Sequence, residues 1–199
     1  RSNALAVAHL HSPYATLFSI VDRPFRPVTL QGALFAEGIP LYREANLVKT
    51  PEQGRQLAEA IGNQRAVLMR GHGAVVAGLD LEEVLFCALV LEDDACKTAQ
   101  AAALGNVGTI SLEECRAFDA ETGLQRRSHR VWKYLAGLEA RWDRQMSSGN
   151  SSVFLSGLAT RSYRENDRLC CSKFIGVQES KRGCSCLTIA CQYELFGYR

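Results

Sequence analysis

A sharp reversal between two apolar runs constrains the fold of this chain more than any other stretch. The runs are 66–69 (Ala-Val-Leu-Met) and 74–77 (Ala-Val-Val-Ala), and residues 70–73 (Arg-Gly-His-Gly) join them. Glycine permits positive φ and a close approach of two backbones, so this link favours a tight turn between two buried strands. A long helical pattern begins soon afterwards at Asp80, with Glu83 placed for a capping box. Strands and helices that alternate in this way predict an α/β fold.

The other expected elements follow from apolar spacing and from helix caps. A buried strand is expected over 5–11, followed by a helix that Ser12 caps and that runs to about Val21. Thr50 and Gln53 form the capping box of a later helix. The remaining expectations are a loop over 22–27, a short helix over 28–36, an edge strand over 39–42, and helices over 51–61, 81–104, 112–122 and 128–146.

Composition limits the classes of function. The 199 residues are 47% hydrophobic and 22% charged, which is enough for one sizeable core. A formal net charge of +2 is too small and too dispersed to indicate a nucleic-acid or anionic-membrane surface. No apolar run approaches the roughly 20 residues that cross a bilayer, and residues 1–5 show no signal-peptide pattern. We therefore expect a cytoplasmic protein without nucleic-acid or membrane partners.

Three of the four histidines lie in two short stretches. His9 and His11 end the expected strand 5–11, and residues two apart in a strand point to the same side. His72 lies in the glycine turn at 70–73. A tripod of imidazoles leaves coordination positions open for substrate, as catalytic metal sites do. The pattern predicts a divalent-metal site at these histidines. A hydrogen-bonded pair at a strand end and a structural histidine in the turn remain the alternatives.

Other polar and aromatic groups receive plainer interpretations. Residues 92–94 (Glu-Asp-Asp) point in different directions on the long helix, so we expect a solvated or intersubunit face there. The aromatic stripe of 128–146 is expected to contact the core or another subunit. His129 has no partner motif and is assigned no role.

The eight cysteines divide into two groups. Cys87, Cys96 and Cys115 are scattered through helical sequence and are expected to be small buried hydrophobes. The other five lie in the last thirty residues, and their spacing does not match the paired Cys-x2-Cys pattern of zinc sites. A structural metal or a disulfide is therefore the less favoured interpretation of that group, which comprises Cys170, Cys171, Cys184, Cys186 and Cys191.

The character of the chain changes near Ser147. Residues 147–152 resemble a linker, and helical periodicity disappears beyond them. We expect residues 1–146 to form one domain, and 147–199 to be a linker and an atypical or out-of-frame tail rather than a second working domain. Because the chain has no initiator methionine and Arg1 lies close before His9, the sequence is also expected to be a fragment without its start.

Taken together, these motifs resemble the class II aldolase/adducin family. The resemblance rests on residues 9–16 (His-Leu-His-Ser-Pro-Tyr-Ala-Thr), 70–76 (Arg-Gly-His-Gly-Ala-Val-Val), 81–84 (Leu-Glu-Glu-Val) and 91–92 (Leu-Glu), and it covers about 4–146. It implies a three-layer α/β/α sandwich with a central mixed sheet. It also implies a cyclic homotetramer with active sites between neighbouring subunits.

The resemblance further implies a cofactor and a chemistry. His9, His11 and His72 would hold Zn²⁺, with Mn²⁺, Fe²⁺ or Co²⁺ as alternatives. Such an ion stabilises the enediolate that remains when a carbon-carbon bond next to a carbonyl breaks. The stretch 27–33 favours decarboxylation of a hydroxy or oxo acid. A sugar-phosphate aldolase or 4-epimerase is the alternative, and a non-catalytic adducin-like interaction protein is the alternative from another class.

The family also places an acid/base carboxylate in a segment before the first histidine, so we expect that group upstream of Arg1. Tyr14, Gln31 and Glu37 lie in stretches that approach the expected metal site, and none of them is assigned a catalytic role.

Overall fold

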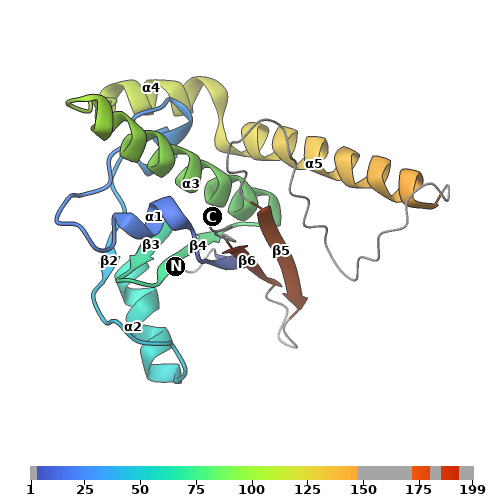
Figure 1. Ribbon diagram of the computed structural model, residues 1–199, viewed down its shortest axis with the longest axis horizontal. Coiled ribbons are helices and arrows are strands. Elements are labelled where there is room, and N and C mark those ends of the chain that lie inside the picture. Colours follow the sequence, from blue (N-terminus) through green and yellow to red (C-terminus); the bar gives the residue numbers. More distant parts are fainter. Residues whose placement is uncertain (1–3, 148–171, 180–184, 193–199) are drawn as a thin grey trace, which may run out of the picture.

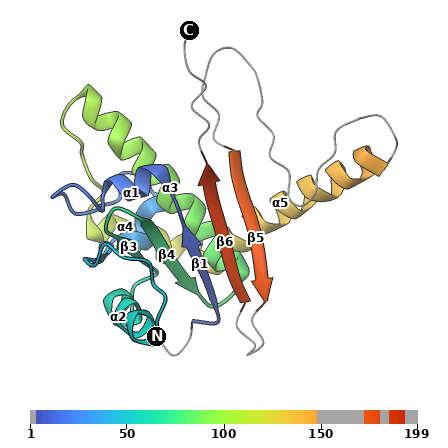
Figure 2. The same cartoon turned by 60° about the horizontal axis from the view of Figure 1, so that its bottom comes forward.

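A six-stranded mixed sheet forms the centre of the computed structural model, which describes residues 4–147, 172–179 and 185–192, and the side chains of 4–141. The strands are β1 (Ala6–Leu10), β2 (Leu41–Tyr42), β3 (Ala66–Met69), β4 (Gly73–Gly78), β5 (Ser172–Glu179) and β6 (Ser185–Gln192). Their order across the sheet is β2-β3-β4-β1-β6-β5, and Figure 2 shows β3, β4, β1, β6 and β5 side by side. β2 lies at one edge, as expected for a strand preceded by proline.

Helices cover both faces of this sheet (Figure 1). The helices are α1 (Pro13–Leu17), the 3-10 helix η1 (Gln31–Phe35), α2 (Pro51–Ile61), α3 (Leu81–Leu104), α4 (Leu112–Thr122) and α5 (Leu124–Ser147). α3 packs on β1 and β4, whereas α2 packs on β2 and β3. Along β1, Ala8 and Leu10 join the core under α3, and Val7 joins the smaller core under α2. The expected three-layer α/β/α sandwich is therefore confirmed.

Several local expectations are confirmed by hydrogen bonds. The Gln53 backbone N–H donates to the Thr50 hydroxyl at 3.2 Å, and the Gln53 side chain accepts in return from Thr50, which completes the capping box of α2. Asp80 caps α3 by accepting from the Glu83 backbone N–H at 2.7 Å. Cys87 and Cys115 are buried, as expected, and Cys96 is partly exposed.

Other boundaries differ from the expectation. α1 ends at Leu17 instead of about Val21, because the chain then tightens into turns with bonds between residues three apart. Ser12 occupies the N-cap position, but its side chain makes no capping hydrogen bond. The short helix expected over 28–36 is a 3-10 helix over 31–35. α5 begins at Leu124, directly after the glycine that ends α4.

The expectation of a solvated or intersubunit acidic face at 92–94 is wrong for two of the three residues, which are buried within this chain. Glu92 is 7% exposed and Asp94 is fully buried, and both carboxylates accept backbone N–H groups. Asp93 alone matches the expectation, because it is exposed and pairs with Lys97. The helical pattern shows where a side chain points, but it does not show that a distant loop supplies donors for it.

Two strands from the segment after residue 147 extend the sheet beyond β1. β6 is parallel to β1, with Ile189 opposite Leu10, and β5 is antiparallel to β6. The side chains of the five C-terminal cysteines and the linker over 148–152 lie outside the described residues. Within the described part of the chain, none of the helices has the length and apolar character needed to cross a membrane.

Candidate metal centre

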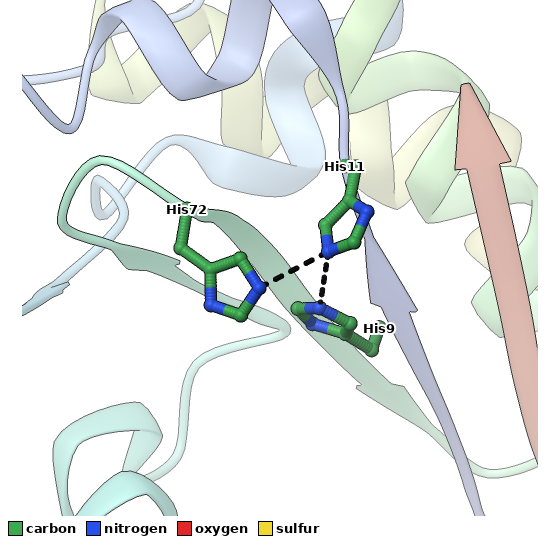
Figure 3. A group of neighbouring side chains, drawn as sticks. All are labelled: His9, His11 and His72. Atoms are coloured by element: carbon green, nitrogen blue, oxygen red, sulfur yellow. Dashed lines mark hydrogen bonds between the residues drawn. The ribbon is translucent and has the colours of Figure 1, made fainter. Parts of the chain in front are cut away.

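Three imidazoles from two separate elements meet at one end of the sheet (Figure 3). His9 belongs to β1, His11 follows its last residue, and His72 lies in the turn between β3 and β4. Nε2 of His11 is 2.9 Å from Nε2 of His9 and 3.1 Å from Nε2 of His72. Among the described residues, this is the one group of three or more metal-ligating side chains whose ligand atoms lie within 4.8 Å of one another.

The close approach of β1 to the glycine turn brings the two halves together. Antiparallel pairing places His9 opposite Val75 and Leu10 opposite Ala74, so β1 ends beside the turn. A Cβ on Gly73 would lie 2.0 Å from the carbonyl oxygen of Leu10, which no side chain tolerates. Glycine at position 73 is therefore required by the contact, in agreement with the role that the sequence predicts for this turn.

The histidines lie on the side of the sheet that α2 covers. Val7 and Val75 pack in the core under α2, and side chains two apart in β1 share a face, so His9 follows Val7 to that side. His9 and His72 are partly buried, whereas His11 is exposed. The cluster thus lies beside the core under α2 and is open to solvent at His11.

Burial and mutual repulsion lower the pKa values of His9 and His72. Burial lowers the pKa of His9 to about 4, with further lowering from the charges of His11 and His72, while a hydrogen bond to the backbone of Ala74 acts in the opposite direction. Burial and the charge of His11 also lower the pKa of His72. At neutral pH His9 and His72 are therefore neutral imidazoles, which is the form that ligates metal ions.

Two of the three nitrogen separations in the cluster fit a single divalent ion. Two imidazole nitrogens at about 2.0–2.1 Å from one ion lie about 2.9–3.4 Å apart for angles between about 90° and 110°. The contacts of 2.9 and 3.1 Å at His11 match that range. Nδ1 of His72 is buried without a hydrogen-bond partner. No hydrogen bond at Nδ1 therefore competes with the orientation that directs Nε2 of this ring to the cluster. An all-imidazole donor set suits zinc and several first-row transition metals.

The other residues considered in the sequence do not join the histidines. Tyr14 packs against the core under α3. Glu37 pairs with Arg116 of α4 at 2.9 Å, and Gln31 opens η1. His129 has a partner after all, because its Nδ1 lies 2.9 Å from a carboxylate oxygen of Glu82 on the surface.

Sequence reasoning missed the buried acids of α3. Glu92 contacts the first turn of α1, which directly follows the His-x-His stretch. One signal was available in the sequence, since the flanking Leu91 and Ala95 are apolar and both prove fully buried. An acid between such neighbours in the middle of a helix faces the interior and needs hydrogen-bond donors there.

Known proteins resemble this chain over the region that contains the three histidines. Residues 1–99 match the model of the Class II Aldolase and Adducin N-terminal domain. A 3,4-dihydroxyphthalate decarboxylase of Rhodococcus jostii (strain RHA1) is 31% identical over 93 residues, which cover 44% of this chain and 38% of that protein. Decarboxylase NovR of Streptomyces niveus is 31% identical over 132 residues, which cover 65% of this chain and 47% of that protein. The chain thus spans less than half the length of either relative.

A solved structure supports the same assignment at the level of the fold. An aldolase II superfamily protein from Pseudomonas syringae superposes with a TM-score of 0.58 at 20% identity, over 71% of this chain and 58% of that one. This likeness concerns the fold alone. Through the match of residues 1–99, the chain belongs to the class II aldolase/adducin family.

Proposed function

We propose that His9, His11 and His72 hold a divalent metal ion, and that the protein is a metal-dependent lyase that breaks a carbon-carbon bond. The convergence of three imidazoles carries this proposal, because Nε2 of His11 lies 2.9 and 3.1 Å from the Nε2 atoms of the other two and all ligand atoms lie within 4.8 Å of one another. Zinc is the proposed ion, with manganese, iron and cobalt as alternatives. Membership in a family of aldolases and decarboxylases supports the reaction class.

The residues of the chain suit an open, catalytic site. Neutral imidazoles leave the positive charge of a bound ion undiminished, and the exposed side of His11 leaves room for a small-molecule substrate. A bound ion supplies Lewis acidity toward substrate oxygens and so favours the negative charge that develops when the bond breaks. A ring-shaped homotetramer and a cytoplasmic location belong to the same proposal.

Decarboxylation of a hydroxy or oxo acid is the favoured reaction. Both curated relatives described above are named decarboxylases, one of them for 3,4-dihydroxyphthalate. Cleavage or 4-epimerisation of a sugar phosphate is the second candidate, which the family's aldolases support. Release of CO₂ from aromatic hydroxy acids indicates decarboxylation, release of an aldehyde from a sugar phosphate indicates aldol cleavage, and inversion at C4 of an intact sugar phosphate indicates epimerisation. Either of the last two results without CO₂ release would favour the second candidate.

Metal content tests the proposal directly. We expect about one equivalent of metal in the purified protein and its loss in His72→Ala, because two imidazoles bind an open site far more weakly than three. His129→Ala is the matched control, since His129 is an exposed histidine that pairs with Glu82 outside the cluster. A metal-free wild-type protein that folds and assembles would refute the enzyme and favour an adducin-like interaction protein.

A further inference from the structure

The short helix α1 connects the two halves of the histidine cluster, because it follows His11 and is linked by hydrogen bonds to the turn that carries His72. It begins shortly after His11, and its first residue, Pro13, has no N–H group. The Thr16 N–H already bonds to the carbonyl before the helix at 2.9 Å. Tyr14 and Ala15 therefore carry the two backbone donors of the first turn that α1 itself does not satisfy.

Glu92 of α3 accepts both of these hydrogen bonds. The Tyr14 N–H donates to its Oε1 at 3.1 Å, and the Ala15 N–H donates to its Oε2 at 3.0 Å. The bonds are charge-assisted, and a carboxylate is favoured at the N-terminus of a helix. Because Ser12 makes no side-chain cap, the cap of α1 comes from a residue that is distant in sequence.

The other end of α1 is fastened to the glycine turn. Ser19 is 3% exposed, and its hydroxyl donates to the Thr16 carbonyl at 2.7 Å. The same hydroxyl oxygen accepts from the Gly71 N–H at 2.9 Å. Gly71 directly precedes His72, so one buried hydroxyl joins α1 to the backbone that carries the third imidazole.

The position of His11 depends on this helix. Pairing with β4 holds β1 as far as Leu10, and the side chain of His11 is exposed, with ring contacts to His9 and His72. After His11 the next fixed points are the donors that Glu92 holds. The separation of His11 from His72 is thus set through α1 as well as through the sheet.

We propose that Glu92 and Ser19 are positioning residues, which fasten α1 as a connection between the backbone of His11 and the turn of His72 and thereby set the metal affinity of the cluster. The inference rests on the proposed function, because it requires that the three histidines bind a metal ion. Neither side chain belongs to the ligand cluster.

Titration of the full chain with Co²⁺, followed by its visible absorption, tests the proposal. Glu92→Gln preserves the shape of the side chain but turns an amide NH₂ toward one of the two N–H donors. Ser19→Ala removes the bridge to the turn. We expect each variant to bind Co²⁺ about tenfold more weakly or worse, a typical effect of losing a residue that orients ligands, and to show an altered spectrum at saturation.

Asp94→Asn is the matched control. Asp94 is also a buried carboxylate of α3, and it accepts backbone N–H bonds from Val28 at 3.1 Å and from Thr29 at 2.9 Å. Its loop carries no histidine. We expect this variant to lower the urea midpoint of unfolding as Glu92→Gln does, while Co²⁺ affinity and spectrum remain those of the wild type.

The outcomes separate this inference from the proposed function. A wild-type protein that binds no Co²⁺ overturns the metal site itself. A wild-type protein that binds Co²⁺, with Glu92→Gln and Ser19→Ala binding equally well, overturns only the positioning role. Equal loss of affinity in Asp94→Asn would show a general effect of stability and would also overturn it. If Glu92→Gln does not fold, the result for Ser19→Ala decides.

Discussion

Replacing Gly73 by alanine should separate the two halves of the histidine cluster. The added Cβ would meet the Leu10 carbonyl oxygen at 2.0 Å, the Leu10 carbonyl carbon at 3.1 Å and the His11 Cα at 3.4 Å. All three neighbours are backbone atoms at the end of β1, and no side chain can rotate away to relieve the contact. The strands themselves have to part.

The size of this movement sets the size of the effect. Ordinary contact for a Cβ begins at 3.4 Å, so the backbone near Leu10 has to retreat by more than about 1 Å. Overpacking of this kind costs about 1–3 kcal/mol of folding free energy. Metal sites tolerate deviations of only about 0.2 Å in ligand distance. Metal affinity should therefore fall much further than stability does.

Urea unfolding and metal titration of the same preparations measure both effects. Gly54→Ala is the matched control, because Gly54 lies in α2 with nothing within 4 Å of the added Cβ. This control should raise the free energy of unfolding by about 0.5–1 kcal/mol and leave metal binding unchanged. Wild-type stability and wild-type metal affinity in Gly73→Ala would refute the reasoning that the close approach of the backbones builds the site.

Two further predictions concern protonation and capping. Unfolded histidine titrates near pH 6.5, whereas the pKa of His9 in the fold is about 4 and that of His72 is lowered in the same direction. The unfolded metal-free chain therefore binds more protons between these values, and its free energy of unfolding should fall as the pH falls from 6.5 to 4. Denaturation curves that show no such slope, or the same slope in His9→Ala, would contradict the assignment. Thr50→Ala should cost about 1 kcal/mol in urea unfolding through loss of the α2 capping box, without an effect on metal affinity; an unchanged urea midpoint would argue against that cap.

The parts of the fold that sequence predicted well depend on residues close together in the chain. The capping box of Thr50 lies within one turn of helix, and the glycines around His72 determine their own turn. The His-x-His spacing likewise predicts that both imidazoles lie on one side, because residues two apart in a strand share a face. Each half of the candidate site could therefore be identified before the structure was known.

The missed features depend on partners from distant parts of the chain. Ser12 has the right position and chemistry for a local cap, yet Glu92 satisfies the first turn of α1 from 77 and 78 residues away. Asp94 satisfies the loop at 28–29 in the same way. Local patterns predict that a helix needs a cap, but only the packing of α3 against α1 determines which residue provides it.

Packing of the core and placement of the site are two results of one strand register. Ala8 and Leu10 are almost fully buried under α3, while His9 lies between them on the opposite face of the sheet. A slip of one residue between β1 and β4 would turn both apolar side chains toward α2 and would bury His9 in the main core. Such a slip would lose apolar burial and place an imidazole without partners in that core. The register that is stabilised by burying Ala8 and Leu10 therefore also places His9 on the face of the sheet where it meets His72.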